Sequence, residues 1–272
     1  MKIRTEDFEV NHKINYRTGQ LRQGLVTGMT VCALMLSGLL MTSSAGAAIS
    51  LDRTRVIFNG NEQSTTLSIS NQNKELPYLA QAWLENAQGN KIDSPLTALP
   101  PLQRIEAGTK SQVKVQITQG IDKLPQDKET LFYFNLREIP PKANKPNTLQ
   151  IALQTRIKLF YRPKAIAITR ADQSNPYQQK LTLMRQGDHF VASNPTPYYI
   201  TLAKASTTLK GDAVKGFEPM MIPPKGNATL GGSASVLGNA PVLTYINDYG
   251  GRPQMMFVCK GDICSVKRVT AG

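Results

Sequence analysis

The sequence predicts an all-β chain of two immunoglobulin-like β-sandwich domains, and three observations support this class. Apolar and polar residues alternate over short runs, almost no window carries a helical stripe, and turn residues separate the runs. With 272 residues, 40% of them hydrophobic and 19% charged, the chain can bury cores and lacks the composition of a disordered or collagen-like protein. This length fits two domains of common size.

Six strands are expected in the first half of the chain. Asn-Gly, Pro-Pro and similar turn residues separate them. The expected strands cover Ile49–Phe58, Thr65–Ser70, Tyr78–Leu84, Gln112–Ile117, Leu131–Ile139 and Leu149–Tyr161. Their number and spacing are typical of an immunoglobulin-like sandwich.

After Arg162 and Pro163 the alternation begins again, which predicts a second sandwich. Its strands are expected at Lys180–Leu183, His189–Ala192, Tyr198–Ala203, Pro219–Ile222, Ala228–Leu230, Val242–Ile246, Gln254–Cys259 and Cys264–Lys267. We therefore expect domains over residues 48–165 and 166–272, joined by a short connection. Two domains joined so closely are expected to meet at an angle and form a cleft.

Residues 1–47 predict a cleaved signal peptide with an unusually long polar region at its start. An uncharged apolar run from Leu25 to Met41 follows Arg17 and Arg22 and leads into small residues that end at Ala47. This order is typical of a secretory leader. A retained membrane anchor is the alternative, because the apolar run nearly reaches the ~20 residues that a membrane span needs.

Removal of the leader also removes Cys32 and leaves two cysteines in an exported chain. Cys259 and Cys264 are then expected to form one disulfide. A Gly-Asp turn signal lies between them, so the bridge is expected to close a hairpin near the C-terminus. Two cysteines and one histidine, His189, fall short of four ligands, so no metal site is expected.

The charge balance is strongly basic. Lys and Arg exceed Asp and Glu by 13 in the whole chain, and by 11 (27 against 16) after residue 47. Such a balance suits nucleic acid, an anionic membrane surface or a carboxylate-bearing partner, and it does not choose among them. Solubility explains it equally well.

The sequence supplies little for catalysis. It contains no nucleophile elbow, zinc-protease helix or phosphate-binding loop, and His189 lies where a turn enters a strand. A glycosidase needs only two carboxylates, whose separation the sequence does not give. We expect no enzymatic activity and no cofactor.

The run from Leu149 to Arg162 is the most informative part of the chain. One explanation is an ordinary half-buried strand. The other is that its first part overhangs the sandwich and offers an unpaired edge to another chain, because the run is long and follows a loop, Pro140–Asn147, without apolar anchors. In an extended run, odd-numbered and even-numbered residues face opposite sides. The odd-numbered positions here include the apolar residues Leu149, Ile151, Leu153, Ile157 and Leu159, and the even-numbered positions include the polar residues Gln150, Gln154, Arg156 and Lys158.

Six motifs occur in order between residues 49 and 268. They are Ser50–Arg55 (SLDRTR), Leu76–Trp83 (LPYLAQAW), Leu131–Pro141 (LFYFNLREIPP), Leu149–Pro163, Asn194–Tyr199 (NPTPYY) and Tyr245–Pro253 (YINDYGGRP). With these motifs the chain resembles the periplasmic pilus-assembly chaperones of the P-pilus (PapD) type, short-loop branch. The resemblance implies a location in the periplasm and two immunoglobulin-like domains arranged as a boomerang around an interdomain cleft.

The resemblance also implies the residues of a binding site. Arg55 and Lys158 would anchor the C-terminal carboxylate of a pilus subunit by charge-assisted hydrogen bonds. Leu149, Ile151 and Leu153 would enter the groove of a subunit whose own sandwich lacks its last strand, which is donor-strand complementation. A structural ionic network of Glu129, Arg162 and Asp248 would set the angle between the domains.

The function implied is that of a chaperone that binds, folds and caps pilus subunits and delivers them to an outer-membrane usher. Its partners would be pilins, tip subunits, adhesin and the usher, with neither nucleic acid nor a small-molecule substrate. An exposed apolar edge also leads us to expect self-capping dimers of the free protein. The alternative is a secreted module that binds anionic glycan or nucleic acid with a steep salt dependence.

Overall fold

The computed structural model describes residues 47–271 except 144, 146 and 170–174. Residues from Ala47 onward form one compact unit. The predicted signal peptide, apart from Ala47, lies outside the described residues. Within the described part of the chain, no helix combines the length and the apolar character needed to cross a membrane.

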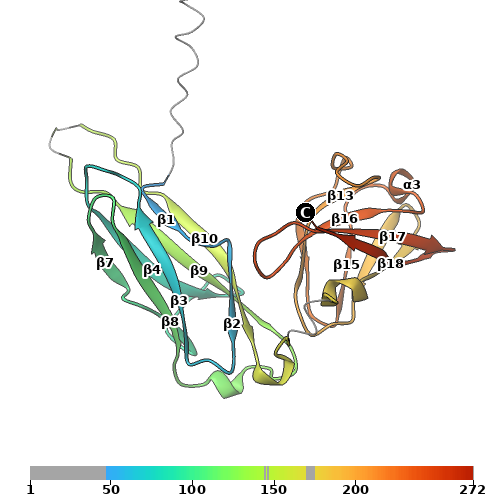
Figure 1. The fold of residues 1–272 in the computed structure, drawn as a ribbon, viewed down its shortest axis with the longest axis horizontal. Coiled ribbons are helices and arrows are strands. Elements are labelled where there is room, and N and C mark those ends of the chain that lie inside the picture. Colours follow the sequence, from blue (N-terminus) through green and yellow to red (C-terminus); the bar gives the residue numbers. More distant parts are fainter. Residues whose placement is uncertain (1–46, 144, 146, 170–174, 272) are drawn as a thin grey trace, which may run out of the picture. The chain divides into compact units, whose positions relative to one another are not determined.

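The first sandwich consists of two sheets around one core (Figure 1). Its four-stranded sheet has the order β1 (Ile49–Leu51), β3 (Ser64–Asn71), β8 (Lys110–Ile117), β6 (Leu96–Leu99). Its six-stranded sheet has the order β2 (Arg55–Asn59), β10 (Gln154–Arg162), β9 (Thr130–Ile139), β4 (Tyr78–Asn86), β5 (Lys91–Ile92), and β7 (Leu102–Ile105) also pairs with β4. Fully buried residues from both sheets, such as Leu67 and Phe134, fill the space between them.

The second sandwich is one eight-stranded sheet that closes on itself. Its end strands, β14 and β15, contact each other, and its core includes Phe190, Leu243 and Phe257. The strand order is β14 (Met220–Ile222), β13 (Ile200–Ser206), β16 (Val242–Ile246), β17 (Gln254–Lys260), β18 (Ile263–Thr270), β11 (Thr182–Gln186), β12 (His189–Asn194), β15 (Gly226–Thr229).

Short helical turns complete the described structure. They are the 3₁₀ helices η2 (Ile121–Lys123), η3 (Lys164–Ile166) and η4 (Tyr177–Lys180) and the single-turn helix α3 (Ala234–Leu237). The prediction of an all-β fold with two sandwiches is confirmed. The predicted disulfide is also confirmed, because Cys259 and Cys264 are bonded where β17 turns into β18.

The prediction of one strand over Ile49–Phe58 is wrong, because this stretch forms two strands in different sheets. β1 ends at Leu51 and pairs with β3, whereas β2 begins at Arg55 and pairs in parallel with β10. The polar residues 52–54 carry no apolar alternation, and there the chain crosses from one sheet to the other. The sequence also fails to predict β5, β6 and β7, since Pro95, Pro100 and Pro101 interrupt the alternation.

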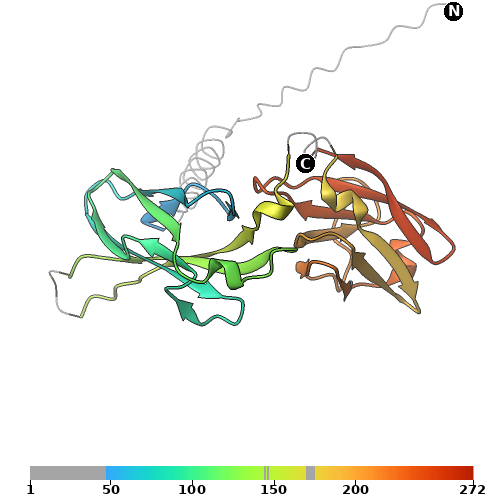
Figure 2. The ribbon, with the colours of Figure 1, turned by 90° about the horizontal axis from the view of Figure 1, so that it is seen from below.

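The prediction of one strand over Leu149–Tyr161 is wrong in its first part. Strand β10 begins only at Gln154, and the segment before it extends past the neighbouring strands (Figure 2). Three apolar residues of this segment are exposed, Leu149 by 85%, Ile151 by 66% and Leu153 by 41%. The residues of the same parity further on, Ile157 and Leu159, lie in the core. The apolar row is therefore exposed to solvent at Leu149–Leu153 and buried in the sandwich at Ile157 and Leu159.

Candidate functional site

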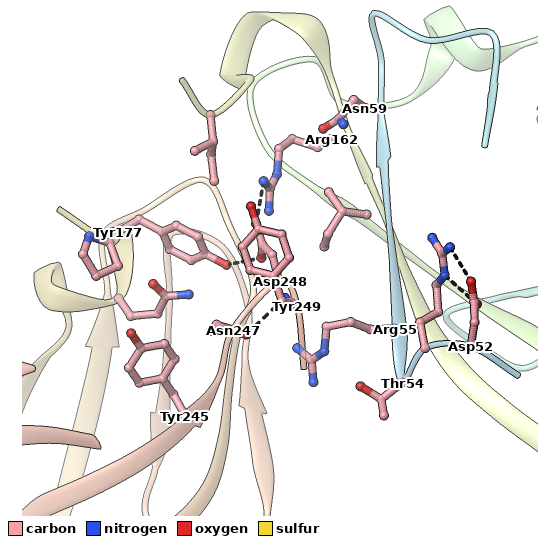
Figure 3. Close-up of a pocket in the computed structure, with 15 residues that line it drawn as sticks. Asp52, Thr54, Arg55, Asn59, Arg162, Tyr177, Tyr245, Asn247, Asp248 and Tyr249 are labelled. Atoms are coloured by element: carbon pink, nitrogen blue, oxygen red, sulfur yellow. Dashed lines mark hydrogen bonds and ion pairs between the residues drawn. The ribbon is translucent and has the colours of Figure 1, made fainter. Parts of the chain in front are cut away.

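Strand β2 divides its side chains between two faces. Val56 and Phe58 are fully buried in the core of the first sandwich. Arg55, Ile57 and Asn59 lie on the opposite face and line a cavity of about 560 Å³ (Figure 3). The second sandwich supplies much of the remaining wall, including Tyr177, Tyr245 and Asn247–Tyr249.

Arg55 and Lys158 occupy equivalent positions in neighbouring strands. They are Cα partners in the parallel pairing of β2 with β10, so their side chains leave the sheet on the same side. Lys158 itself is not part of the cavity lining. The pairing of strands thus places together two cations that are far apart in the sequence.

Arg55 is buried with donor capacity to spare. Its side chain is 8% exposed, and its Nη1 donates to the carbonyl oxygen of Ile246 at 3.2 Å. Its Nε is buried without a hydrogen-bond partner among the described residues. An anion that accepts a hydrogen bond from this buried N–H would be bound favourably, because the N–H has no other partner in the described part of the chain.

Lys158 lies in an environment that disfavours its charge. Burial, and then the charge of Arg55, lower the pKa of Lys158. Within the described residues, neither Lys158 nor Arg55 has a carboxylate at salt-bridge distance. By contrast, Arg53 on the rim of the cavity pairs with Asp52 at 2.8 Å. Arg55 and Lys158 are therefore cations of this region that lack a carboxylate partner among the described residues.

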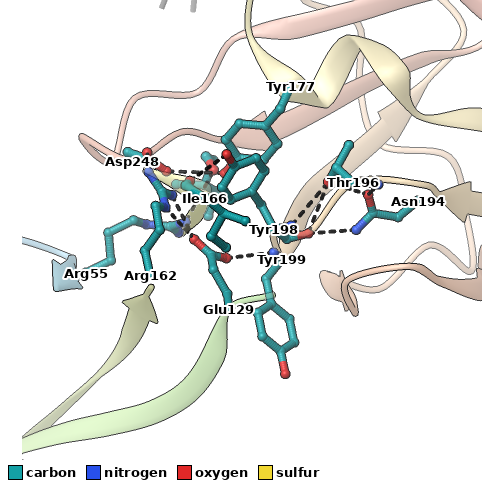
Figure 4. A network of polar contacts seen from close by, with 11 residues as sticks. Arg55, Glu129, Arg162, Ile166, Tyr177, Asn194, Thr196, Tyr198, Tyr199 and Asp248 are labelled. Atoms are coloured by element: carbon teal, nitrogen blue, oxygen red, sulfur yellow. Dashed lines mark hydrogen bonds and ion pairs between the residues drawn. The ribbon is translucent and has the colours of Figure 1, made fainter. Parts of the chain in front are cut away.

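Arg162 joins the two sandwiches in a buried ionic network (Figure 4). Its Nε donates to Glu129 Oε1 and its Nη1 donates to Asp248 Oδ2, both at 2.9 Å. The other oxygen of Glu129 accepts from the Tyr199 amide at 2.7 Å, and the Tyr177 hydroxyl donates to Asp248 Oδ1 at 3.2 Å. Arg162 ends β10, whereas Asp248 follows β16. The structure thus brings together the three residues expected to form this network.

Both pKa shifts within the network are upward, which disfavours the charged form of Glu129 and favours that of Arg162. Burial raises the pKa of Glu129 to about 7, although Arg162 and the Tyr199 amide oppose this. Burial disfavours the charge of Arg162, but the carboxylates of Glu129 and Asp248 outweigh it and raise the pKa of Arg162. Both oxygens of Glu129 accept hydrogen bonds from these partners, so the contacts fit an ionised Glu129.

The turn between β16 and β17 approaches β2 closely. Gly250 in this turn has φ +85°, and a Cβ at its position would lie 2.5 Å from Thr54 Oγ1. Because only glycine combines this backbone conformation with such a close approach, Gly250 allows the turn to lie against the residue before Arg55. The same turn carries Asp248, and it follows directly on Ile246, the acceptor of Arg55.

We expect Gly250→Ala to destabilise the protein more than Gly89→Ala. Gly89 has φ +84°, and nothing lies within 4 Å of the Cβ that would be added there, so it is a matched control. Both changes place alanine at positive φ, which costs on the order of 1 kcal/mol. The collision with Thr54 adds about 1–3 kcal/mol in Gly250→Ala alone. Urea denaturation of both variants measures the difference, and equal losses would show that the close approach does not matter.

The edge of β10 is open on the side of β2. Strand β9 pairs with β10 from Gln154, whereas β2 pairs with it only from Lys158. Main-chain groups of residues 154–157 on that side are thus available to another strand. The open edge continues into the exposed segment that contains Leu149, Ile151 and Leu153.

Several contributors to the site were not predicted from the sequence. Tyr177 and Tyr199 complete the network, and Gly250 allows the close approach to Thr54. The repeated tyrosines of Asn194–Tyr199 and the glycines after Asp248 are visible in the sequence. Their roles depend on which strands lie side by side, and periodicity does not show this.

Two family models match the chain in succession. The first, described as "Pili and flagellar-assembly chaperone, PapD N-terminal domain", covers residues 48–167. The second, described as "Pili assembly chaperone PapD, C-terminal domain", covers residues 176–257. The chain is also 52% identical over 231 residues to "Chaperone protein PapD" of Escherichia coli, a match that covers 85% of this chain and 94% of that protein.

Other relatives agree with this assignment. "Probable fimbrial chaperone YfcS" of Escherichia coli (strain K12) is 50% identical over 239 residues, which cover 88% of this chain and 93% of that protein. The solved structure of the periplasmic chaperone SfaE is similar with a TM-score of 0.61 and 29% identity, over 78% of this chain and all (100%) of that one. The SafB chaperone was solved in complex with the SafA pilin of Salmonella enterica. It is similar with a TM-score of 0.64 and 29% identity, over 80% of this chain and 99% of that one. Since both family models match in order and relatives at 50% identity or more extend over nearly their whole length, the chain belongs to the PapD family of pilus-assembly chaperones.

Proposed function

We propose that this chaperone binds pilus subunits by donor-strand complementation. In this proposal residues 149–153 supply a missing strand to the subunit, and Arg55 and Lys158 hold the subunit's C-terminal carboxylate. One observation carries the proposal: buried Arg55 and half-buried Lys158, without a carboxylate partner among the described residues, adjoin an open strand edge, which leads into exposed Leu149, Ile151 and Leu153.

The anchor and the open edge support each other physically. A one-residue shift in the pairing of two strands turns every side chain to the other face. A carboxylate held at Arg55 and Lys158 fixes that pairing, because charge-assisted hydrogen bonds have demanding geometry. The leucines and isoleucine at residues 149, 151 and 153 would then all point into the subunit, as alternate residues of one strand do.

The partners that we propose are pilins, tip subunits and adhesin, followed by an outer-membrane usher. A solved relative, SafB, is bound to a pilin, which supports the first of these. The two cations of the site are adjacent and partly or fully buried rather than spread over a surface, so we do not propose nucleic acid or an anionic glycan as the ligand. We infer that the chain acts by binding alone, without a catalytic step or cofactor.

We also propose how the chain is organised and where it acts. The domains are assigned to residues 48–165 and 166–272, and export with cleavage after Ala47 would deliver the mature protein to the periplasm. In that compartment the disulfide between Cys259 and Cys264 is stable. Free molecules would pair their exposed segments in self-capping dimers, which dissociate when a subunit arrives.

Arg55→Ala and Lys158→Ala are expected to weaken binding of a purified pilin by roughly 10- to 100-fold each. Each change removes one charge-assisted hydrogen bond, which contributes about 1.5–3 kcal/mol. Arg53→Ala is the control, because Arg53 lies on the same cavity but is already paired with Asp52. Titration calorimetry of the three variants measures the affinities.

A pilin with an amidated C-terminus separates the anchor from the rest of the interface. It should bind the unchanged chaperone at least as weakly as the normal pilin binds Arg55→Ala, because amidation removes the charge that both cations hold. If Arg55→Ala and Lys158→Ala both bind the normal pilin as tightly as the unchanged protein does, the proposed anchor is wrong.

A further inference from the structure

A carboxylate occupies an inward-facing position at the end of β9. Along this strand Phe132, Phe134 and Leu136 point into the core of the first sandwich, and Glu138 continues the same row. Glu138 is only 5% exposed. Because burying a carboxylate is costly unless hydrogen bonds satisfy it, the partners of Glu138 indicate its role.

Glu138 binds two main-chain amides that are far apart in the sequence. Its Oε2 accepts from the amide of Ile49 at 2.9 Å, and Ile49 begins β1 of the four-stranded sheet. Its Oε1 accepts from the amide of Leu153 at 3.4 Å. The amide of Glu138 in turn donates to the carbonyl oxygen of Leu153 at 3.0 Å. One side chain thus ties the start of β1 to the end of the exposed segment.

Leu153 marks the boundary between the exposed segment and the paired strand. The pairing of β9 with β10 begins one residue later, at Gln154. Further along, Lys158 is fixed by its pairing with Arg55 of β2. The open edge of β10 is therefore held at both ends, by Glu138 at Leu153 and by β2 at Lys158.

We propose that Glu138 is a positioning residue for the donor strand. It holds the base of the exposed segment against β1, so that Leu149, Ile151 and Leu153 meet a subunit in one register. Without this tie the base of the segment would have to be ordered during binding, and the lost conformational freedom would weaken the complex. The inference rests on the proposed use of this segment as a donor strand and adds a residue remote from the carboxylate anchor.

Glu138→Ala and Glu138→Gln test the tie in the free protein and in the complex. In Glu138→Ala, hydrogen exchange at the amides of Ile49 and Leu153 should become about tenfold faster, as expected for the loss of one hydrogen bond each. The amide of Phe134, in the middle of β9, should not change. A pilin complex of this variant should dissociate about tenfold faster.

The conservative and the control variants separate positioning from general stability. Glu138→Gln keeps one acceptor oxygen and should give intermediate exchange and dissociation rates; it also serves if Glu138→Ala does not fold. Glu106→Ala removes an exposed carboxylate of the same domain and should change none of these rates. Urea midpoints are measured for every variant.

Two results would overturn the inference. Unchanged hydrogen exchange at the amides of Ile49 and Leu153 in both variants would mean that Glu138 does not hold the exposed segment to β1. A lower urea midpoint with an unchanged dissociation rate would mean that Glu138 only stabilises the rim of the sandwich. If Arg55→Ala and Lys158→Ala both bind pilin as tightly as the unchanged protein does, it is the proposed anchor that fails, and the exchange rates of the free protein still test the tie.

Discussion

Ile151→Asp is expected to abolish subunit capture while leaving the free chaperone as stable as before. Ile151 is 66% exposed, so a carboxylate at this position remains in water until a subunit binds. On binding it would enter an apolar groove, which costs several kcal/mol. The favourable burial of the isoleucine side chain in the subunit, worth about 1.5–3 kcal/mol, is lost as well. The sum corresponds to a decrease in affinity of roughly a thousandfold or more.

Ala152→Asp is the matched control for this prediction. It adds the same charge one residue away, where the side chain of an extended segment points to the other side. Calorimetric titration with a pilin should show much weaker binding only for Ile151→Asp, and urea midpoints of the free proteins should agree. Equal effects of the two changes would mean that residues 149–153 do not bind as a strand with one inserted face.

Arg162→Ala is expected to lower the free energy of unfolding by about 3–5 kcal/mol. The variant leaves Glu129 buried with only the Tyr199 amide as a partner, and it removes the guanidinium that Asp248 accepts from. Breaking a buried ion pair from one side costs this much because an uncompensated charge stays behind. Urea denaturation followed by circular dichroism measures the loss.

Arg156→Ala provides the comparison for Arg162→Ala. Arg156 pairs with Glu85 at 2.9 Å, but its side chain is 40% exposed, and an exposed pair contributes less than about 1 kcal/mol. The double variant Glu129→Gln/Arg162→Met should recover part of the stability lost in Arg162→Ala, because no buried charge is stranded. If Arg162→Ala is no less stable than Arg156→Ala, the network does not hold the fold as we describe.

The core strands could be predicted from the sequence because each buries one row of apolar residues. Phe132, Phe134 and Leu136 of β9 show the period of two directly, and they lie in the core. The same rule fails at Leu149–Leu153, where the apolar row continues but the sandwich does not. Periodicity identifies an apolar face of a strand. It does not show whether that face packs against this chain's own sandwich or against another protein.

The cations and the network depend on neighbours that periodicity does not identify. Taken alone, Arg55 and Lys158 are ordinary charged residues, and only the family resemblance assigns them to a common site. Their adjacency follows from the parallel pairing of β2 with β10, strands separated by most of the first sandwich. Glu138 did leave a signal, because a carboxylate in the row of Phe134 and Leu136 breaks an inward-facing pattern.

The most direct measurement of the central claim is hydrogen exchange at the amides of residues 149–157, with and without a bound pilin. The amides of this stretch that face away from β9 should exchange at least about a hundredfold more slowly in the complex, because a subunit strand would then accept from them, whereas those of β18 in the second sandwich should exchange at the same rate. A complex that forms while residues 149–153 exchange as fast as in the free protein would contradict donor-strand complementation by this segment.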